Sequence, residues 1–146
     1  MSSIRDTLSG QASLLAELTA QALEPTLVKL GLTFSTFELL TSIRAAGKNA
    51  SQADVARRLG ITPPSLTEAV RLAVKAGLIE QAASASDGRS KTLCVTSLGT
   101  QKLKEVLIAV NHAEKLMVKG IGTEDLQSAI AVLQLASRNL ARGMAD

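Results

Sequence analysis

Aromatic residues are nearly absent from this sequence, which has two Phe, no Trp and no Tyr among its 146 residues. Hydrophobic residues nevertheless make up 46% of the chain, which is too much for a disordered protein. The core must therefore be built from Leu, Ile, Val and Ala, a composition that favours helix packing over sheet packing. The length favours one compact domain, or a core with helical extensions.

Cysteine and long apolar runs are also scarce. Cys94 is the only cysteine, so the chain cannot form an internal disulfide. The sequence contains no stretch of 18 apolar residues, so it predicts no membrane-spanning helix. Residues 1–10 lack the basic and then apolar pattern of a signal peptide. We therefore expect a cytoplasmic protein with no membrane partner.

The sequence also lacks the residue patterns of an enzyme active site. It offers no Cys/His pair expected to be in contact, no carboxylate pair with a clear chemical role and no nucleophile elbow. Gly47 and Lys48 lack the spacing of a phosphate-binding loop, so they predict a helix end and a turn. His112 is the only histidine, and a zinc site would need further ligands. We predict no catalysis, cofactor or metal site, and a structural or solvent-facing role for His112.

What the sequence does contain is a series of helix starts and stops. Ser and Thr residues precede amphipathic segments and glycines follow them, which is how helices commonly begin and end. The predicted caps are Thr33, Ser51, Thr62, Thr96 or Ser97, and Thr123. The predicted helices cover 12–24 with a kink or break at Pro25, 26–30, 34–46, 52–59, 63–76, about 98–119 and 124–143, and the predicted strands cover 78–83 and 91–96. Two short helices with a tight turn, followed directly by a hairpin, predict a winged helix.

The second helix of this pair, 63–76, separates into two faces. The apolar face, which is expected to pack on the preceding helices, consists of Leu66, Ala69, Val70 and Ala73, with Val74 beside them. The other positions carry Pro64, Ser65, Thr67, Glu68, Arg71, Leu72 and Lys75. Such side chains can reach base edges, phosphates or thymine methyl groups, and free N–H groups at a helix start attract phosphates. An ordinary solvated helix face is the alternative interpretation.

Positive charge is concentrated around this helix. The chain has a net charge of +3 and a pI of about 9.3, which permits nucleic-acid binding without demanding it. Residues 47–91 contain seven Lys or Arg and four Asp or Glu residues, so this segment accounts for the whole net charge. The remainder of the chain is near neutral, which favours a nucleic-acid contact in the predicted winged helix.

The ordered motifs resemble those of the MarR family of bacterial winged-helix transcription regulators. The stretch "GLTFSTFELL" resembles the opening of the family's second helix, and "SQADVARRLGITPPSLTEAV" resembles its helix-turn-helix core. The stretches "KAGLIEQ" and "SDGRSKTLCVTSLG" resemble the run and the wing signature that follow. The similarity spans about residues 13–142, nearly the whole chain.

This resemblance implies a mainly helical fold with a small β-hairpin. A winged helix-turn-helix DNA-binding domain would occupy 34–96, and a helical dimerisation region would occupy 1–33 and 97–146. The homodimer would bind a near-palindromic operator in double-stranded DNA, with its recognition helices in the major groove and its wings toward the minor groove. The implied function is repression of nearby genes, relieved by a small amphipathic effector. The expected DNA contacts are Thr62, Pro64, Ser65, Thr67, Glu68, Arg71, Lys75, Asp87, Arg89 and Lys91.

The wing carries one arginine in this interpretation. Asp87 is expected to position Arg89, which would enter the minor groove or hold a phosphate, so Arg89 should contribute more to binding than Lys48. Glu68, Gln81 and Gly88 depart from the family pattern, because they stand where arginines or other contact residues are common. The alternative is therefore a MarR-like dimer with weakened or lost operator binding that acts as a ligand-binding or protein-interaction module.

Two further expectations concern possible small-molecule chemistry. By resemblance, a ligand pocket would lie between the dimer helices and the winged domain, lined by Leu14, Leu18, Phe37 and Leu40; the alternative is that these four residues are simply core. Cys94 is expected to be a small packed residue. Strand alternation would instead turn Cys94 away from Leu93 and Val95 and expose it.

Overall fold

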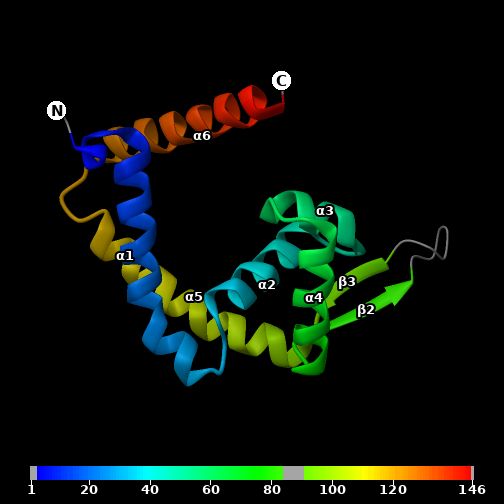
Figure 1. Cartoon of the computed structure of the whole chain (residues 1–146). Helices are drawn as coiled ribbons and strands as arrows, with labels where there is room; N and C mark the ends of the chain where they lie inside the picture. Colours follow the sequence, from blue (N-terminus) through cyan, green and yellow to red (C-terminus); the bar gives the residue numbers. More distant parts are fainter. Residues whose placement is uncertain (1–2, 84–90, 146) are drawn as a thin grey trace. The chain divides into compact units, whose positions relative to one another are not determined.

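The computed structural model describes residues 3–83 and 91–145 of the chain. The chain divides into two compact units, Met1–Asn111 and His112–Asp146. Figure 1 shows the elements in chain order: the 3-10 helix η1 (Ile4–Asp6), α1 (Leu8–Lys29), α2 (Phe34–Ala46), β1 (Ala50–Ser51), α3 (Gln52–Leu59), α4 (Pro63–Lys75), β2 (Ile79–Ala83), β3 (Lys91–Val95), α5 (Ser97–Met117) and α6 (Thr123–Ala145). Four helices, a hairpin and two further helices confirm the predicted winged-helix order.

Hydroxyl side chains start helices α2, α3, α4 and α5 as the sequence predicts. The Oγ atoms of Thr33, Ser51 and Thr62 accept hydrogen bonds from backbone N–H groups three residues later, at N···O distances of 3.1, 3.1 and 3.3 Å. Thr96, one of two predicted caps, starts α5 because its Oγ1 accepts from the Gly99 N–H at 3.1 Å. These four helices begin where a local side chain satisfies a backbone donor.

Helix α1 runs through Pro25 without interruption. The predicted break at this proline and the predicted start at residue 12 are both wrong. Leu23 and Leu27 are buried on either side of Pro25, so their packing holds the helix together across the lost N–H group. The start lies four residues earlier because the Thr7 side chain caps the first turn.

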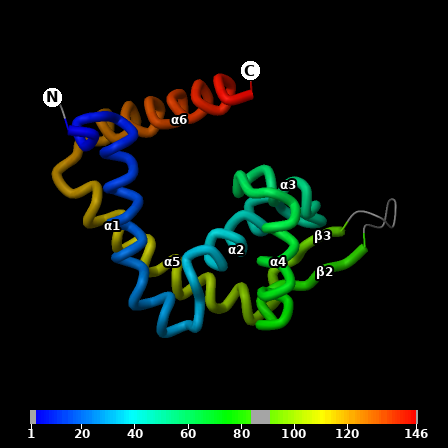
Figure 2. Tube along the Cα trace, viewed as in Figure 1, coloured from blue at the N-terminus to red at the C-terminus, as the bar shows by residue number. Residues whose placement is uncertain are grey.

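The wing belongs to a sheet of three strands in the order β1-β3-β2. Strand β1 pairs antiparallel with β3, placing Ala50 opposite Leu93. Strand β1 is absent from the strands predicted from the sequence, because two residues are too few to show an alternating pattern. This short pairing fixes the base of the wing to the start of α3, and the tube in Figure 2 follows β2 and β3 outward from that base.

The core of the first unit is built from aliphatic side chains, as predicted from the scarcity of aromatics. Helices α1 to α5 and all three strands contribute to it: Leu23, Leu27, Leu32, Leu39, Leu40, Ile43, Ala50, Val55, Ala56, Leu66, Val70, Ala73, Leu78, Ile79, Leu93, Leu103 and Val106. Phe34 and Phe37 are only partly buried and pack against its edge. The Lys102 ammonium of α5 also donates a 2.7 Å hydrogen bond to the Leu30 carbonyl at the end of α1. A cation at this position stabilises the helix C-terminus.

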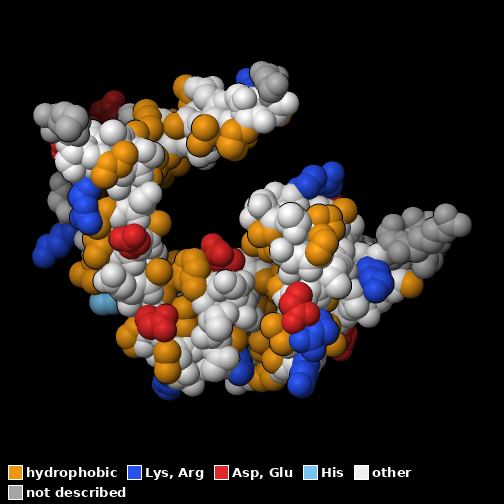
Figure 3. All heavy atoms as spheres, viewed as in Figure 1, with side chains coloured by type: hydrophobic (Ala, Val, Ile, Leu, Met, Phe, Trp, Pro, Cys, Tyr) orange, Lys and Arg blue, Asp and Glu red, His pale blue; other side chains and the backbone are white. Residues whose placement is uncertain are grey.

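The second unit contains the end of α5 and helix α6. Helix α6 begins at Thr123 itself, one residue before the predicted start, and none of its residues Thr123–Ala145 is buried. Its exposed large apolar residues are Ile130, Val132, Leu133, Leu135, Leu140 and Met144. Figure 3 shows apolar side chains gathered along this helix. None of the described helices is both long and apolar enough to cross a membrane.

Candidate nucleic-acid interface

The turn between α3 and α4 orients the two helices of the pair. Gly60 adopts a left-handed conformation with φ of 65°, which lets the chain reverse within three residues before Thr62 starts α4. Helix α3 buries Val55 and Ala56, so its orientation is fixed by the core. Figure 1 shows the resulting pair beside the β2–β3 hairpin.

The packed face of α4 determines which side chains face solvent. Leu66, Val70 and Ala73 are buried in the core, as predicted. Val74 is 42% exposed, so its placement on the packed face is wrong. It follows Ala73 by one residue, which rotates its side chain about 100° around the helix axis and out of the core. All of the α4 residues predicted to contact DNA are exposed: Pro64, Ser65, Thr67, Glu68, Arg71 and Lys75.

An ion pair joins the two central charges of this exposed face. Arg71 donates from Nε and Nη2 to the two Glu68 carboxylate oxygens, at 2.9 and 2.7 Å. The hydrogen bond from Arg71 holds the pKa of the Glu68 carboxyl below its ordinary value, and the Arg71 pKa is raised in turn. These two hydrogen bonds use Nε and Nη2, so the Nη1 group of Arg71 makes no hydrogen bond to Glu68. Arg71 can therefore bind a further acceptor while the pair carries no net charge.

A second pair neutralises a cation on α3. Arg57 forms an ion pair with Asp54, three residues earlier on the same helix. Figure 3 shows acidic and basic side chains lying side by side over α4. Two of the seven cations of residues 47–91 are therefore paired with carboxylates in the folded domain, while the net excess of three, which already counts those carboxylates, is unchanged.

The start of α4 does not offer the free N–H groups expected there. Pro63 and Pro64 have no amide hydrogen, and the next two N–H groups, of Ser65 and Leu66, donate to the side chain and carbonyl of Thr62. The expected attraction of phosphates by this helix start is therefore wrong, since its first four backbone positions have no donor to spare. The hydroxyls remain: Thr62 Oγ1 lies 2.9 Å from Ser65 Oγ, and both residues are exposed.

A polar network that the sequence analysis missed connects the wing with both helices. Gln81 of β2 donates from Nε2 to Gln52 Oε1 of α3 at 2.7 Å. Gln52 Nε2 lies 3.5 Å from Thr67 Oγ1 of α4, and that hydroxyl donates to the Pro63 carbonyl at 3.0 Å. This hydrogen bond joins the Gln81 side chain of the wing to α3. Gln52 and Gln81 lie 29 residues apart in the chain, so no local pattern could have indicated their contact.

The strands of the wing are paired over their full described length. The ladder of β2 with β3 runs from Ile79 opposite Val95 to Ala83 opposite Lys91. Lys91 is exposed at the last pair of this ladder, toward the tip. Asp87 and Arg89, the predicted wing contacts, lie outside the described residues, as does Gly88.

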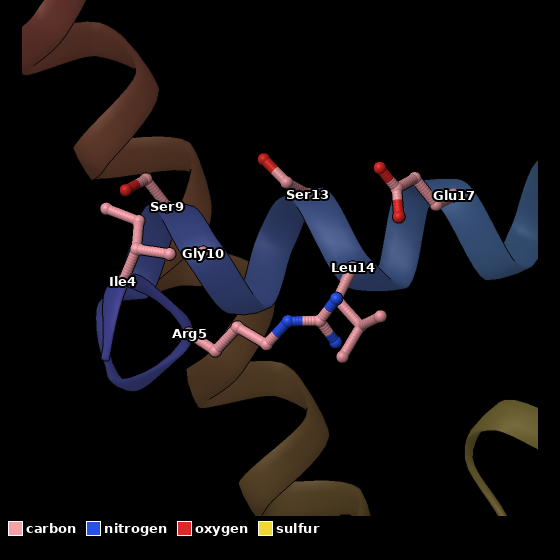
Figure 4. A pocket seen from close by; sticks show the side chains of 7 residues that line it. All are labelled: Ile4, Arg5, Ser9, Gly10, Ser13, Leu14 and Glu17. Carbon is pink, nitrogen blue, oxygen red and sulfur yellow. The ribbon is translucent and has the colours of Figure 1, made fainter. Parts of the chain in front are cut away.

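The four residues predicted to line a ligand pocket have different environments. Leu40 is fully buried in the core, Phe37 packs against the core edge, and Leu18 is 50% exposed on α1. Leu14 lines a small pocket of about 210 Å³ where η1 folds back on α1. Figure 4 shows Arg5 extending along α1 toward Leu14, with Ser13 and Glu17 at the other edge of the helix. Within residues 3–83 and 91–145, none of the pockets described here is lined by all four residues.

The remaining candidates have simple environments. Cys94 is exposed, so the expectation of a packed cysteine is wrong and the strand alternation is correct: Leu93 beside it is buried. His112 is exposed. Among the described residues, no group of three or more His, Cys, Asp or Glu side chains could hold a metal ion.

Comparisons with known proteins agree with this geometry. Residues 30–90 match the family model of the MarR family. The fold resembles that of MepR from S. aureus, solved as a DNA complex, with a TM-score of 0.83, 21% identity, and coverage of 94% of this chain and 99% of that chain. It also resembles a mutant MarR from E. coli complexed with operator DNA (TM-score 0.78, 18% identity, 92% and 99% coverage). CouR from Rhodococcus jostii RHA1, bound to p-coumaroyl-CoA, matches with a TM-score of 0.79, 21% identity, and 92% and 94% coverage.

Proposed function

We propose that this chain, whose residues 30–90 match the family model of the MarR family, is a dimeric DNA-binding transcription regulator. The observation that carries this proposal is the exposed face of α4, which presents hydroxyls, a guanidinium and an ammonium beside an antiparallel wing. A helix of this kind fits the major groove, and a hairpin beside it reaches the adjacent backbone or minor groove.

The polar side chains of α4, its N-cap Thr62 and Pro64 have separate roles in this proposal. Thr62, Ser65 and Thr67 offer hydroxyls to base edges or phosphates, and Pro64 offers an apolar contact to a thymine methyl group. Glu68 and Arg71 act together, because Arg71 can reach a guanine while held by the carboxylate. Lys75 and Lys91 contact phosphates, and Asp87 and Arg89, which lie outside the described residues, are the further contacts proposed for the wing. The DNA-binding domain occupies 34–96.

Dimerisation follows from the apolar side chains that α6 leaves exposed. Six large apolar residues lie exposed between Ile130 and Met144, and isolated helices gain most of their stability from packing of such a face. Helix α1 also exposes Leu8, Leu15 and Leu18. We assign the region 1–33 and 97–146 to a two-fold dimer interface, which would place two recognition helices on a near-palindromic operator.

The regulatory role proposed is repression of nearby genes, relieved when a small amphipathic molecule binds. CouR, which shares this fold, was solved with p-coumaroyl-CoA bound, so the fold can accommodate a small ligand. A ligand acts in this way only if it binds the DNA-free conformation more tightly than the DNA-bound one.

Fluorescence anisotropy tests the proposal directly. The purified protein is titrated against the DNA upstream of its own gene and against a scrambled duplex of the same composition, between 50 and 300 mM KCl. We expect selective binding whose affinity falls linearly with the logarithm of the salt concentration. Arg89→Ala should weaken binding more than Lys48→Ala. Failure to bind this DNA and a genomic fragment library selectively at any salt concentration would refute the proposal.

The second candidate function is a MarR-like dimer that binds a ligand or protein instead of an operator. The specific observation in its favour is charge compensation: Arg57 and Arg71, two of the cations of the helix-turn-helix, are each paired with a carboxylate. A dimer with intact mass in light scattering and a salt slope near zero would establish this alternative over the first.

A further inference from the structure

A pocket opens on the side of the first unit formed by α2, β3 and α5. It has a volume of about 400 Å³, which is within the range of small-molecule sites. The end of α2, the turn at residues 47–49, β3 and the first turns of α5 form its walls. The pocket is not lined by Leu14, Leu18, Phe37 or Leu40, so it is distinct from the ligand pocket predicted from the sequence.

Apolar side chains form much of the lining of this pocket. Ile43, Leu93 and Leu103 line it and are themselves buried in the core, so their positions are fixed by packing. Val95 adds a further half-buried aliphatic side chain. A rigid aliphatic lining without aromatic rings suits the hydrocarbon part of a ligand, and it gains free energy from apolar area removed from water.

The charged groups of the pocket are both cations. Arg44 and Lys48 line it, and no Asp or Glu does. The ion pairs within the described part of the chain use Arg57 and Arg71, so neither pocket cation has a carboxylate partner there. Both are exposed and able to bind an anion, and the planar guanidinium of Arg44 matches a carboxylate with two parallel hydrogen bonds.

The backbone turn that carries Lys48 has an unusual conformation. Asn49 has a φ of 59°, and it is the only residue other than glycine with a positive φ in the described part of the chain. Gly47 precedes it with a φ of 83°. Asparagine tolerates this left-handed region better than most residues, so the turn can hold Lys48 at the rim of the pocket.

We propose that this pocket binds a small amphipathic carboxylate, with the carboxylate between Arg44 and Lys48 and the apolar part against Ile43, Leu93 and Leu103. The inference rests on the proposed function for its biological meaning, since such a ligand would be the effector of the regulator. Strand β3 connects the pocket to the wing, because its residues pair with both β1 and β2. A ligand that displaces β3 would therefore alter the wing.

Cys94 provides a built-in reporter for the test, because it lines the pocket and is the only thiol in the chain. The rate of alkylation by iodoacetamide is followed by mass spectrometry with octanoate, with 1-octanol and with no addition, in the absence of DNA. We expect octanoate to slow the alkylation of Cys94 at least about threefold at saturation, and 1-octanol to do so only at higher concentration. Glutathione in the same mixture should react at an unchanged rate.

Variants separate the roles of charge and shape. Arg44→Gln and Lys48→Gln should each raise the octanoate Kd about three- to tenfold, as expected for partly screened charge-assisted contacts. Lys104→Gln removes the same charge from an exposed α5 position outside the pocket and should leave the Kd unchanged. Thr100→Met keeps both cations but extends a side chain from the lining, so it should also weaken binding. Circular dichroism melting curves verify that each variant is folded.

The outcomes distinguish this inference from the proposed function. Absence of protection by octanoate, or equal protection by 1-octanol, would overturn the assignment of a carboxylate site even if operator binding is intact. If Lys104→Gln reduces the protection of Cys94 by octanoate as much as Arg44→Gln does, octanoate is attracted only by the overall positive charge. That result would also overturn the assignment of a carboxylate site. Protection without any DNA binding would uphold the pocket and refute the regulator.

Discussion

Replacing Glu68 with Gln tests whether the Glu68–Arg71 pair limits the hold of the protein on DNA. In the folded domain the carboxylate takes two hydrogen bonds from the guanidinium, at 2.9 and 2.7 Å. Glutamine keeps the size of the side chain but removes the charge, so Arg71 becomes free to neutralise a phosphate. Both side chains are exposed, and the fold should be unaffected.

The magnitude follows from counterion release. One additional phosphate contact steepens the slope of log K against log salt concentration by about 0.9 and strengthens binding about fivefold at 150 mM salt. Anisotropy titrations of Glu68→Gln between 50 and 300 mM KCl measure both quantities. The matched control is Glu105→Gln, which makes the same charge change at an exposed position of α5 outside the winged domain. Equal effects of the two variants would refute the reasoning, because they would show only a change in overall charge.

Four further predictions concern the fold and the interface. The Glu68 carboxyl should titrate by NMR below its ordinary pKa of 4.5, and Arg71→Ala should restore that value. Because the pKa is lowered, the Glu68–Arg71 ion pair is fully formed above the ordinary carboxyl pKa and is lost as the pH falls through the lowered pKa. An unchanged titration midpoint of Glu68 in Arg71→Ala would contradict Arg71 as the cause of the shift. Gly99→Ala should lower the free energy of unfolding by about 1–3 kcal/mol in urea titrations, since a Cβ would lie 2.3 Å from a backbone carbonyl oxygen; the exposed Gly143→Ala, which has open space, is the control. Gln81→Ala should weaken operator binding without lowering the melting temperature, whereas Gln101→Ala on α5 should do neither; equal binding by both would exclude a positioning role. Leu133→Asp should shift the mass in light scattering toward the monomer, and an unchanged mass would exclude α6 from the dimer interface.

Local signals explain why much of the fold could be predicted. Thr33, Ser51 and Thr62 cap the helices that follow them because the capping bond spans only three residues, so its signature is visible in sequence. The break expected at Pro25 failed because burial of neighbouring leucines in the core outweighs the local cost of proline. Strand β1 was missed because its two residues are held only by distant β3.

The candidate site was less predictable than the fold, because its properties depend on pairs of side chains. Helical spacing correctly placed Glu68 and Arg71 on the exposed face, but only the structure shows that they neutralise each other. The bond between Gln52 and Gln81 joins residues from two separate elements, which no local pattern encodes. The pocket at Arg44 and Lys48 likewise depends on β3 and α5 meeting the end of α2.

If α4 binds DNA as proposed, the pairing of charges on it should affect specific and non-specific binding differently. On an unrelated sequence, Glu68 can only repel the phosphates that Arg71 would otherwise neutralise, so the pair weakens non-specific attachment. Over a G·C pair, Arg71 can donate to guanine while Glu68 accepts from the cytosine amino group, so both partners find favourable contacts. In the proposed DNA complex, the pair would therefore penalise wrong sequences more than the correct one. A regulator built in this way should show modest affinity, a shallow salt slope and a high specificity ratio, and Glu68→Gln should raise affinity for scrambled DNA more than for the operator.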